Sequence, residues 1–309
     1  MKKCVIIYNP ESGRRKTKLI ENTFYDHLEK NGYDVILLRT RKKGDASMLI
    51  QSIDKADLVI SAGGDGTLNE VVKGNLQREK RLTIANLPMG TTNDFGFMLG
   101  HTRNYVKNLD LLINGVVKEI DVCLINEHPF VYVACLGDFI NLSYETPRKL
   151  KEQYGKFGYI YYGLKQLKKK ITEYDISYTI DGETYHGKYA FMFITNASRV
   201  AGINNVYDDI KLDDKMFEVA FYPIKNKADI MKAIMYITTT DVKNIPGIEY
   251  YQTDNLEIEF NSTPNASWCI DGEEYKHNTN KFIFRIDKGD NKMLVPTKNV
   301  EKLFESDEE

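Results

Sequence analysis

Apolar runs alternate with amphipathic stretches between residues 1 and 125. The apolar runs are rich in β-branched residues, as strands are, and lie at 4–8, 34–40, 57–62 and 82–87. The stretches between them carry apolar positions at helical spacing, as at 17–31 and 104–115. Strands buried on both faces read as continuous apolar runs, and helices between them imply parallel pairing. The pattern predicts an α/β domain built on a parallel sheet.

After Asp121 the chain becomes rich in aromatic residues and strand-like. Turn residues separate the runs, among them the pairs Asp181-Gly182 and Asp271-Gly272. The strand-like runs lie at 129–137, 174–181, 185–196, 216–224, 255–262, 267–275 and 281–287. Only two segments show a helical pattern, Pro147 to Lys170 and Lys227 to about Tyr236. Frequent short strands with Asp-Gly turns predict an antiparallel β-rich domain, a β-sandwich.

We therefore expect two closely packed domains. The first spans 1–122, and the second, β-rich domain spans 123–292. The tail from 293 to 309 returns to a helical pattern, and we expect it to form a helix that packs onto the first domain. No internal repeat or low-complexity linker separates the two parts.

Composition and charge indicate a globular protein and exclude some classes of partner. Of the 309 residues, 28% are charged and 42% hydrophobic, which is ordinary for a globular protein. The net charge of −2 gives no overall attraction to nucleic acid, so we expect no nucleic-acid partner. The four cysteines form no CxxC pair and read as buried, reduced thiols. No stretch of about 20 apolar residues is present, and we expect a cytoplasmic protein.

The stretch 61–74, SAGGDGTLNEVVKG, places glycines around a carboxylate between a strand and a helix. Such a turn exposes backbone N–H groups that bind phosphate, and the helix dipole adds positive potential. Asp65 would repel a bare phosphate unless a divalent cation lies between them. One interpretation is therefore a metal-bound nucleotide. The other is a tight turn in which Asp65 caps the helix.

Two further loops favour the nucleotide interpretation. In the loop 8–16, Asn9, Ser12 and Gly13 can donate hydrogen bonds, and the basic residues 14–16 add positive charge. In the loop 88–95, donors at 91–93 precede the carboxylate of Asp94. All three loops follow strands of one parallel sheet, so we expect their tips to gather at one edge, where open α/β sheets bind ligands.

These motifs resemble a known family. NPxSG at 9–13, GGDGTLNEVV at 63–72 and PMGTTNDF at 88–95 are similar to the diacylglycerol kinase catalytic domain of bacterial lipid kinases. The resemblance continues through 143–151, 211–214 and 271–273, and so covers nearly the whole chain. It implies a nucleotide-binding α/β domain, a β-sandwich domain and an active site in the cleft between them. NAD kinases and phosphofructokinases carry similar GGDGT turns, but the TTNDF element is more specific to lipid kinases.

The resemblance also implies site residues. Those expected to contact ATP are Asn9, Pro10, Glu11, Ser12, Gly13, Thr40, Gly64, Asp65, Gly66, Thr67, Leu68, Asn69, Glu70 and Thr91. Asp65 is expected to act through Mg²⁺ on the phosphates, and Glu273 corresponds to the general base, although the pattern does not separate it from Glu274. Asp94 and Asp121 are similar to carboxylates that shape the charge of the site. A structural Mg²⁺ would be held by Asp214 and the carbonyls of Lys211 and Met216, beside Lys215 where glycine is more usual.

The segment 148–170 combines basic with aromatic residues. One interpretation is an amphipathic surface that contacts anionic headgroups, as expected of an enzyme associated peripherally with the inner face of the membrane. The other is a solvated basic helix whose aromatic face packs on the sandwich.

The sequence thus predicts an ATP- and Mg²⁺-dependent kinase that phosphorylates diacylglycerol to phosphatidic acid. Ceramide, phosphatidylglycerol and polyprenol remain alternative acceptors, because each offers a hydroxyl near its headgroup. An NAD kinase-like activity and a non-catalytic nucleotide or lipid sensor are the other hypotheses. A homodimer is expected from the resemblance alone.

Overall fold

The computed structural model describes residues 1–12, 17–137, 171–223, 226, 229, 232, 236 and 241–306. The chain divides into two compact units, each with its own core. The first unit comprises Met1–Val122, Lys211–Asp214 and Lys288–Glu309. The second comprises Cys123–Ile210 and Lys215–Asp287.

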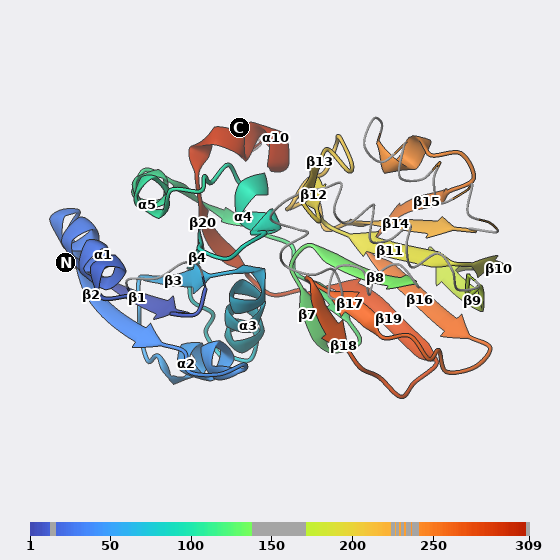
Figure 1. Ribbon diagram of the computed structural model, residues 1–309, viewed down its shortest axis with the longest axis horizontal. Helices are drawn as coiled ribbons and strands as arrows, with labels where there is room; N and C mark the ends of the chain where they lie inside the picture. The colour runs from blue at the N-terminus through green and yellow to red at the C-terminus, as the bar shows by residue number, and fades with distance from the viewer. Residues whose placement is uncertain are drawn as a thin grey trace. The chain divides into compact units, whose positions relative to one another are not determined.

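A six-stranded sheet with the order β2-β1-β3-β4-β20-β5 organises the first unit (Figure 1). Its strands are β1 (Lys2–Tyr8), β2 (Tyr33–Arg39), β3 (Leu58–Gly63), β4 (Ile84–Pro88), β5 (Val116–Glu119) and β20 (Lys292–Val295). All neighbours are parallel except β5, which pairs antiparallel with β20. Every residue of β3 and β4 is buried, which explains why their sequences are mostly apolar, with Ser61 and Asn86 as buried polar exceptions.

Helices cover both faces of this sheet. They are α1 (Thr17–Lys30), α2 (Asp45–Ser52), α3 (Asp65–Leu76), α4 (Asp94–Met98) and α5 (Tyr105–Ile113). The pair α2 and α3 packs together on one face, and α1 and α5 lie on the other (Figure 1). The N-terminus of α5 is capped by Asn104, whose side chain accepts from the backbone N–H groups of Val106 and Lys107.

The C-terminal segment differs from the expected helix over 293–309. Lys292–Val295 is instead the strand β20, which lies between β4 and β5. Only the short helices η2 (Thr297–Asn299) and α10 (Val300–Leu303) follow it within the described residues. The expectation was wrong because this segment pairs with β4 as a strand of the sheet. Met293 and Val295 are completely buried there.

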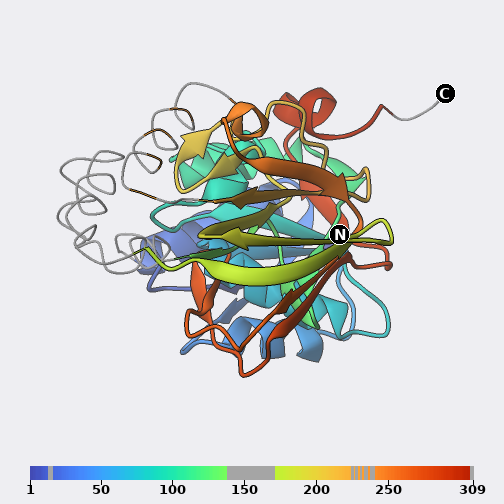
Figure 2. The same ribbon diagram turned by 90° about the vertical axis from the view of Figure 1, so that its right-hand side faces the viewer.

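The second unit is a sandwich of two antiparallel six-stranded sheets, with the orders β10-β9-β16-β19-β6-β7 and β15-β14-β11-β8-β17-β18. The first sheet contains β6 (Cys123–Ile125), β7 (His128–Phe130), β9 (Tyr174–Ile180), β10 (Glu183–Tyr189), β16 (Asn255–Phe260) and β19 (Lys281–Ile286). The second contains β8 (Val133–Gly137), β11 (Phe191–Thr195), β14 (Phe217–Tyr222), β15 (Glu249–Thr253), β17 (Trp268–Ile270) and β18 (Glu273–Tyr275). Figure 2 shows these strands from a direction at right angles to Figure 1.

Aromatic side chains fill the sandwich. Trp268 is fully buried and contacts the rings of Phe282 and Phe284 from the opposite sheet. A small hairpin of β12 (Arg199–Val200) and β13 (Ile203–Asn204) and a short helix, η1 (Val242–Asn244), lie outside the two sheets. An α/β unit on a mainly parallel sheet and an antiparallel β unit confirm the predicted fold class.

Some element predictions differ in detail. The run 185–196 is two strands, β10 and β11, rather than one. The helical pattern at 147–170 lies outside the described residues, as does nearly all of that at 227–236.

Among the described residues, no helix is both long enough and apolar enough to cross a membrane.

Candidate active site

The glycine turn after β3 comes into direct contact with the loop after β4. A β-carbon at Gly90 would lie 2.7 Å from the Cα of Gly64, so only glycine allows the two backbones to approach this closely. The N–H of Met89 also donates to the carbonyl of Gly63, at 2.7 Å. The structure therefore joins the GGDGT turn and the PMGTTNDF loop, as predicted for loops that follow neighbouring strands of one sheet.

Asp65 connects these same two loops through its side chain. It is the first residue of α3, but its carboxylate accepts from the N–H groups of Asp94, at 3.0 Å, and Phe95, at 3.4 Å. These are the first N–H groups of α4, while α3 itself begins after Gly64 with no side-chain cap. Asp65 thus caps a helix, as one interpretation of the sequence held, but the helix is α4 and not its own.

The first loop is anchored to the glycine turn by Asn9. Its Nδ2 donates to Oγ1 of Thr67, at 3.2 Å, and its backbone N–H donates to the carbonyl of Ala62, at 3.0 Å. Its Oδ1 accepts from the N–H of Glu11, at 3.0 Å, which folds the loop back on itself. Asn9 and Thr67 therefore hold the NPxSG loop against the N-terminus of α3. Gly13 lies outside the described residues.

The third loop is shaped internally. Asn93 has a left-handed backbone with φ of 49°, and its amide both accepts from the N–H and donates to the carbonyl of Gly90. The side-chain amide of Asn93, expected to donate to phosphate, is engaged within the loop. Thr91 and Thr92 are exposed beside it, whereas Asp94 is only 1% exposed.

Glu70 lies farther along α3 and organises the start of α2. Its two carboxylate oxygens accept from the N–H groups of Gly44, at 2.7 Å, and Ala46, at 3.1 Å. A carboxylate at a helix N-terminus is stabilised by the dipole as well as by these bonds. The Thr40–Gly44 connection is thereby fixed relative to the glycine turn.

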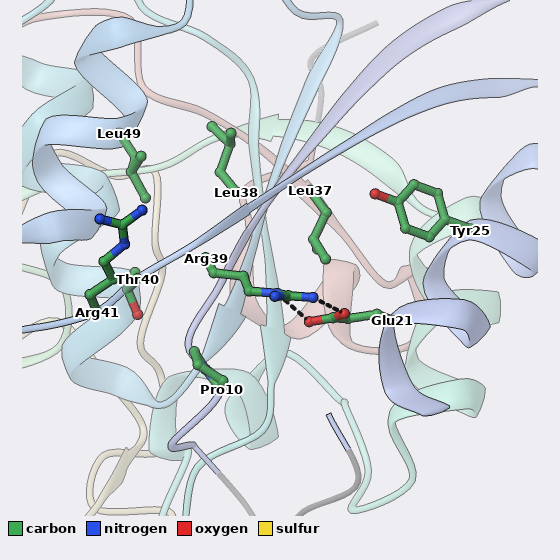
Figure 3. A pocket seen from close by; sticks show the side chains of 9 residues that line it. All are labelled: Pro10, Glu21, Tyr25, Leu37, Leu38, Arg39, Thr40, Arg41 and Leu49. Carbon is green, nitrogen blue, oxygen red and sulfur yellow. Dashed lines mark hydrogen bonds and ion pairs between the residues drawn. The ribbon is translucent and has the colours of Figure 1, made fainter. Parts of the chain in front are cut away.

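A pocket of about 710 Å³ lies along β2, the edge strand of the sheet, and contains two residues expected to contact ATP, Pro10 and Thr40. It is lined by Pro10, Glu21, Tyr25, Leu37, Leu38, Arg39, Thr40, Arg41 and Leu49. Consecutive strand residues point to opposite faces, so a pocket that touches 37–41 follows the edge of the strand. Figure 3 shows Glu21 and Tyr25 on one side of β2, and Arg41 and Leu49 on the other.

Arg39 and Glu21 form the principal polar contact in this pocket. The Arg39 guanidinium donates two hydrogen bonds to the Glu21 carboxylate, one of them from Nε to Oε1 at 2.6 Å (Figure 3). The Glu21 side chain is 7% exposed, whereas that of Arg39 is 59% exposed. Neither residue was identified from the sequence, because each reads as an ordinary surface charge; only their pairing across the strand edge gives them a place in the pocket.

The segment Lys211–Asp214 joins the first unit beside Asp121. The N–H of Asp121 donates to the carbonyl of Leu212, at 2.6 Å. The ammonium of Lys211 donates to the carbonyl of Phe304, at 2.7 Å, at the C-terminal end of α10. Asp213 accepts from the N–H of Glu305, and burial raises the pKa of its carboxyl group. These bonds position the loop in which a structural Mg²⁺ is expected.

Lys215 in this loop is exposed and has a φ of 60°. Glycine adopts this left-handed conformation without strain, which gives a physical reason for glycine being more usual at the position. The expected Mg²⁺ ligands are oxygen atoms, the Asp214 carboxylate and two carbonyls, and Mg²⁺ prefers oxygen.

The described residues contain no cluster of three or more acidic, histidine or cysteine side chains suited to a metal ion. Such a cluster is not required beside a nucleotide, because Mg²⁺ is commonly held by one or two carboxylates together with substrate phosphates and water. Asp65 on the glycine turn fits that mode of binding.

Glu273 begins β18, directly after a turn at Asp271 and Gly272 with φ values of 48° and 86°. It lies opposite Ile270 of β17 and is partly exposed. The neighbouring Glu274 has other partners, since its carboxylate accepts from Oγ of Ser267, at 3.0 Å, and lies 3.7 Å from Nζ of Lys276. Both carboxylate oxygens of Glu274 are thus engaged on this hairpin.

Comparisons with known proteins place the chain in a family. The profile of the diacylglycerol kinase catalytic domain matches residues 3–125. Diacylglycerol kinases from Bacillus subtilis strain 168 and Staphylococcus aureus strain MRSA252 are each 32% identical to this chain, over 88% of it and 90% and 86% of their own lengths.

Solved structures agree on the fold. A crystal structure of a diacylglycerol kinase from Bacillus anthracis superposes with a TM-score of 0.78 at 24% identity, over 96% of this chain and 98% of that one. An NAD kinase from Archaeoglobus fulgidus, solved in complex with ATP, gives a TM-score of 0.52 at 12% identity, over 96% of this chain and 94% of that one. Together with the sequence relatives, these findings show that the chain belongs to the diacylglycerol kinase family and is a phosphotransferase.

Proposed function

We propose that this protein transfers the γ-phosphate of ATP to the free hydroxyl of diacylglycerol, in a Mg²⁺-dependent reaction that yields phosphatidic acid. The observation that carries the proposal is the joining of the three polar loops at one edge of the sheet. Asn9 donates a hydrogen bond to Thr67, and Asp65 accepts one from the N-terminus of α4. The backbones of Gly64 and Gly90 are in contact. A turn of this kind at the N-terminus of α3 suits phosphate groups.

Different residues are proposed to bind different parts of the nucleotide. The backbone of the loop 9–13 and of the turn 64–67 would bind the phosphates, with Thr91 adding a hydroxyl donor. Pro10 and Thr40 line the pocket along β2, whose size and partly apolar lining suit a nucleoside. Asp65 would hold Mg²⁺, which when bound offsets the charge of the phosphates.

Glu273 is the proposed general base. Its carboxylate would accept the proton of the lipid hydroxyl as the hydroxyl oxygen bonds to the γ-phosphorus and the bond from phosphorus to the β–γ bridging oxygen breaks. ADP leaves with that bridging oxygen, and the proton remains on Glu273 until solvent removes it. Asp94 and Asp121 are proposed to keep the site negative enough to favour a bound cation.

An acceptor screen tests the proposal. The purified protein would be incubated with γ-labelled ATP and Mg²⁺ in mixed micelles that contain diacylglycerol, ceramide, phosphatidylglycerol or polyprenol, and separately with NAD⁺. We expect label in phosphatidic acid at a rate well above that for any other acceptor, and none when the metal is chelated. Preferential labelling of NAD⁺ would contradict the proposal, as would Mg²⁺-independent transfer.

Substitution of the base gives a second test. Glu273→Gln removes the proton acceptor and should lower kcat about 10²- to 10⁴-fold, since that is the usual contribution of a general base. ATP binding should be retained. Glu274→Gln is the matched control and should leave kcat nearly unchanged, because its carboxylate is engaged with Ser267 and Lys276. A non-catalytic sensor would show neither transfer nor any effect of Glu273→Gln.

A membrane lipid as acceptor implies peripheral contact with the inner face of the membrane, and we propose this together with a homodimer. The basic, aromatic segment 148–170 that motivates the contact lies outside the described residues. Sedimentation with vesicles that contain diacylglycerol and anionic lipid should recover the protein in the pellet, and less of it at high salt. Analytical ultracentrifugation without lipid should give twice the mass of one chain.

A further inference from the structure

Asp271 is a buried carboxylate in the hairpin that carries Glu273. It is 3% exposed, and its oxygens accept from the backbone N–H groups of Val131, at 2.7 Å, and of Tyr132 and Val133, both at 3.0 Å. Its own N–H donates to the carbonyl of Val133, at 2.8 Å. Four hydrogen bonds therefore tie this one residue to a short segment of chain.

That segment leads from one sheet of the sandwich to the other. β7 ends at Phe130 in one sheet and β8 begins at Val133 in the other, so residues 131 and 132 form the crossover. Val131, Tyr132 and Val133 are 2%, 5% and 3% exposed. Buried backbone N–H groups require a partner, and a carboxylate is suited to several of them because it only accepts.

The position of Glu273 depends on the same residue. Asp271 and Gly272 form the two-residue turn between β17 and β18, both with positive φ, and Ile270 lies opposite Glu273 across it. Such a turn fixes where the second strand begins relative to the first. Because Asp271 is bonded to the crossover through both its side chain and its backbone, the start of β18 is fixed to the crossover as well.

We propose that Asp271 is a positioning residue for Glu273. It acts by holding the turn in place and not by contact with the substrates, so that the Glu273 carboxylate meets the acceptor hydroxyl at the required distance and angle. The inference rests on the proposed function, in which Glu273 is the base. A catalytic group displaced by about 1 Å loses much of its effect, which gives this placement its functional weight.

A double-mutant cycle tests the inference. Asp271→Asn keeps one oxygen but places an amide NH₂ group against backbone N–H groups. We expect kcat to fall about 10- to 100-fold, as for other residues that orient a catalytic group, with KM for ATP unchanged. Asp271→Asn should cause no further loss in the Glu273→Gln background, because a positioning residue has no effect once the group that it positions is gone.

Two further variants separate positioning from stability. Tyr178→Phe removes hydroxyl contacts with Glu249 and Tyr251 in the same unit and involves none of β8, β17 or β18. It should lower Tm yet leave kcat unchanged below the unfolding transition. If Asp271→Asn does not fold, Gly272→Ala takes its place. This substitution leaves the Asp271 carboxylate in place, and the added β-carbon would approach no atom more closely than Oη of Tyr132, at 3.6 Å. It does strain the backbone, because the φ of residue 272 is 86°. It should lower kcat only while Glu273 is present.

The outcomes distinguish this inference from the function on which it rests. Wild-type kcat in Asp271→Asn would overturn the positioning role, as would an equal fold-loss in the Glu273→Gln background. If Glu273→Gln is inactive while Asp271→Asn and Gly272→Ala are fully active, Glu273 stays the base and only the positioning role fails. If Glu273→Gln itself turns over normally, the assignment of the base and this inference fail together.

Discussion

At the residue scale, the contact between Gly64 and Gly90 brings the two most characteristic loops of the chain together. The missing side chains allow the approach, and Asp65 then bonds across it to α4. Two successive residues of the turn after β3 thereby have different physical functions, because Gly64 allows the approach and Asp65 bonds across it.

Gly90→Ala tests this contact. Its β-carbon would lie 2.7 Å from the Cα of Gly64, so the loops must separate. We expect KM for ATP to rise at least about tenfold, since displacement of the order of 1 Å weakens a preorganised site, with only a small change in Tm. Gly64→Ala is the comparison, because its β-carbon would lie 3.4 Å from the Cα of Gly90 and should have a smaller effect. Equal KM values for wild type and Gly90→Ala would show that the contact does not matter for ATP.

His101 provides a prediction about pH. It is 6% exposed, and burial lowers its pKa from 6.5 to about 4, with the side chain of Asn108 opposing part of this shift. The unfolded chain therefore binds a proton more readily than the folded protein between these values. The free energy of unfolding should fall as pH is lowered through this window, by up to about 3 kcal/mol.

Urea unfolding at several pH values between 7 and 4 measures the effect. His101→Gln should remove this part of the pH dependence, whereas His186→Gln, at an exposed histidine, should not. Identical slopes for wild type and His101→Gln would contradict the prediction.

At the element scale, the N-termini of α2 and α4 are held by carboxylates from a neighbouring helix, α3. Asp65 of α3 caps α4, and Glu70 of α3 caps α2. Glycine precedes α2 at Gly44, where φ is 89° and no side chain of its own can cap the helix. The helices around the expected nucleotide site are thus fixed to one another through α3.

Glu70→Gln tests the cap on α2. One of the two accepting oxygens and the negative charge at the helix N-terminus are lost, so the free energy of unfolding should fall by about 1–2 kcal/mol. Thermal unfolding measures this directly. Glu79→Gln, an exposed glutamate beyond the end of α3, is the control and should be neutral. The cap would be unimportant if both variants unfolded at the wild-type temperature.

At the scale of the whole molecule, the first unit is discontinuous in sequence. β20 pairs with both β4 and β5, so the C-terminal segment links β5 to the rest of the sheet. Lys211 and Leu212 add a third piece of chain, bonded to α10 and to Asp121. The α/β unit is therefore complete only when residues from three distant parts of the chain are present.

Removal of residues 288–309 should therefore unfold the first unit. The loss leaves β4 with an open edge and exposes the apolar surface that Met293 and Val295 cover. Met293→Ala is the milder test and should cost about 2–5 kcal/mol, as for other buried side chains reduced to alanine. Removal of residues 307–309 alone is the control. Unchanged circular dichroism and Tm after the longer truncation would refute this dependence.

The apolar runs and their spacing determined most of the architecture in advance. Buried parallel strands and half-buried antiparallel strands differ in pattern, so both units were recognisable. The approach of the glycine turn to its neighbouring loops was also predictable, because parallel strands present their ends at one edge. The polar character of Asn9, Asp65 and the 88–95 loop was likewise visible in the sequence, and their roles toward a nucleotide stay a prediction.

Tertiary structure alone decided which partners those residues take. Periodicity reports which face of an element is buried but not what covers it. Residues 293–295 were therefore expected to be helical, whereas they belong to β20, which pairs with β4. Likewise, Asp65 caps α4, the helix after the next strand, and Arg39 forms hydrogen bonds with Glu21 beside β2. Asp271 accepts hydrogen bonds from the crossover between β7 and β8, which lies more than a hundred residues away in the chain. Each pairing depends on approach between distant segments, which local sequence patterns do not encode.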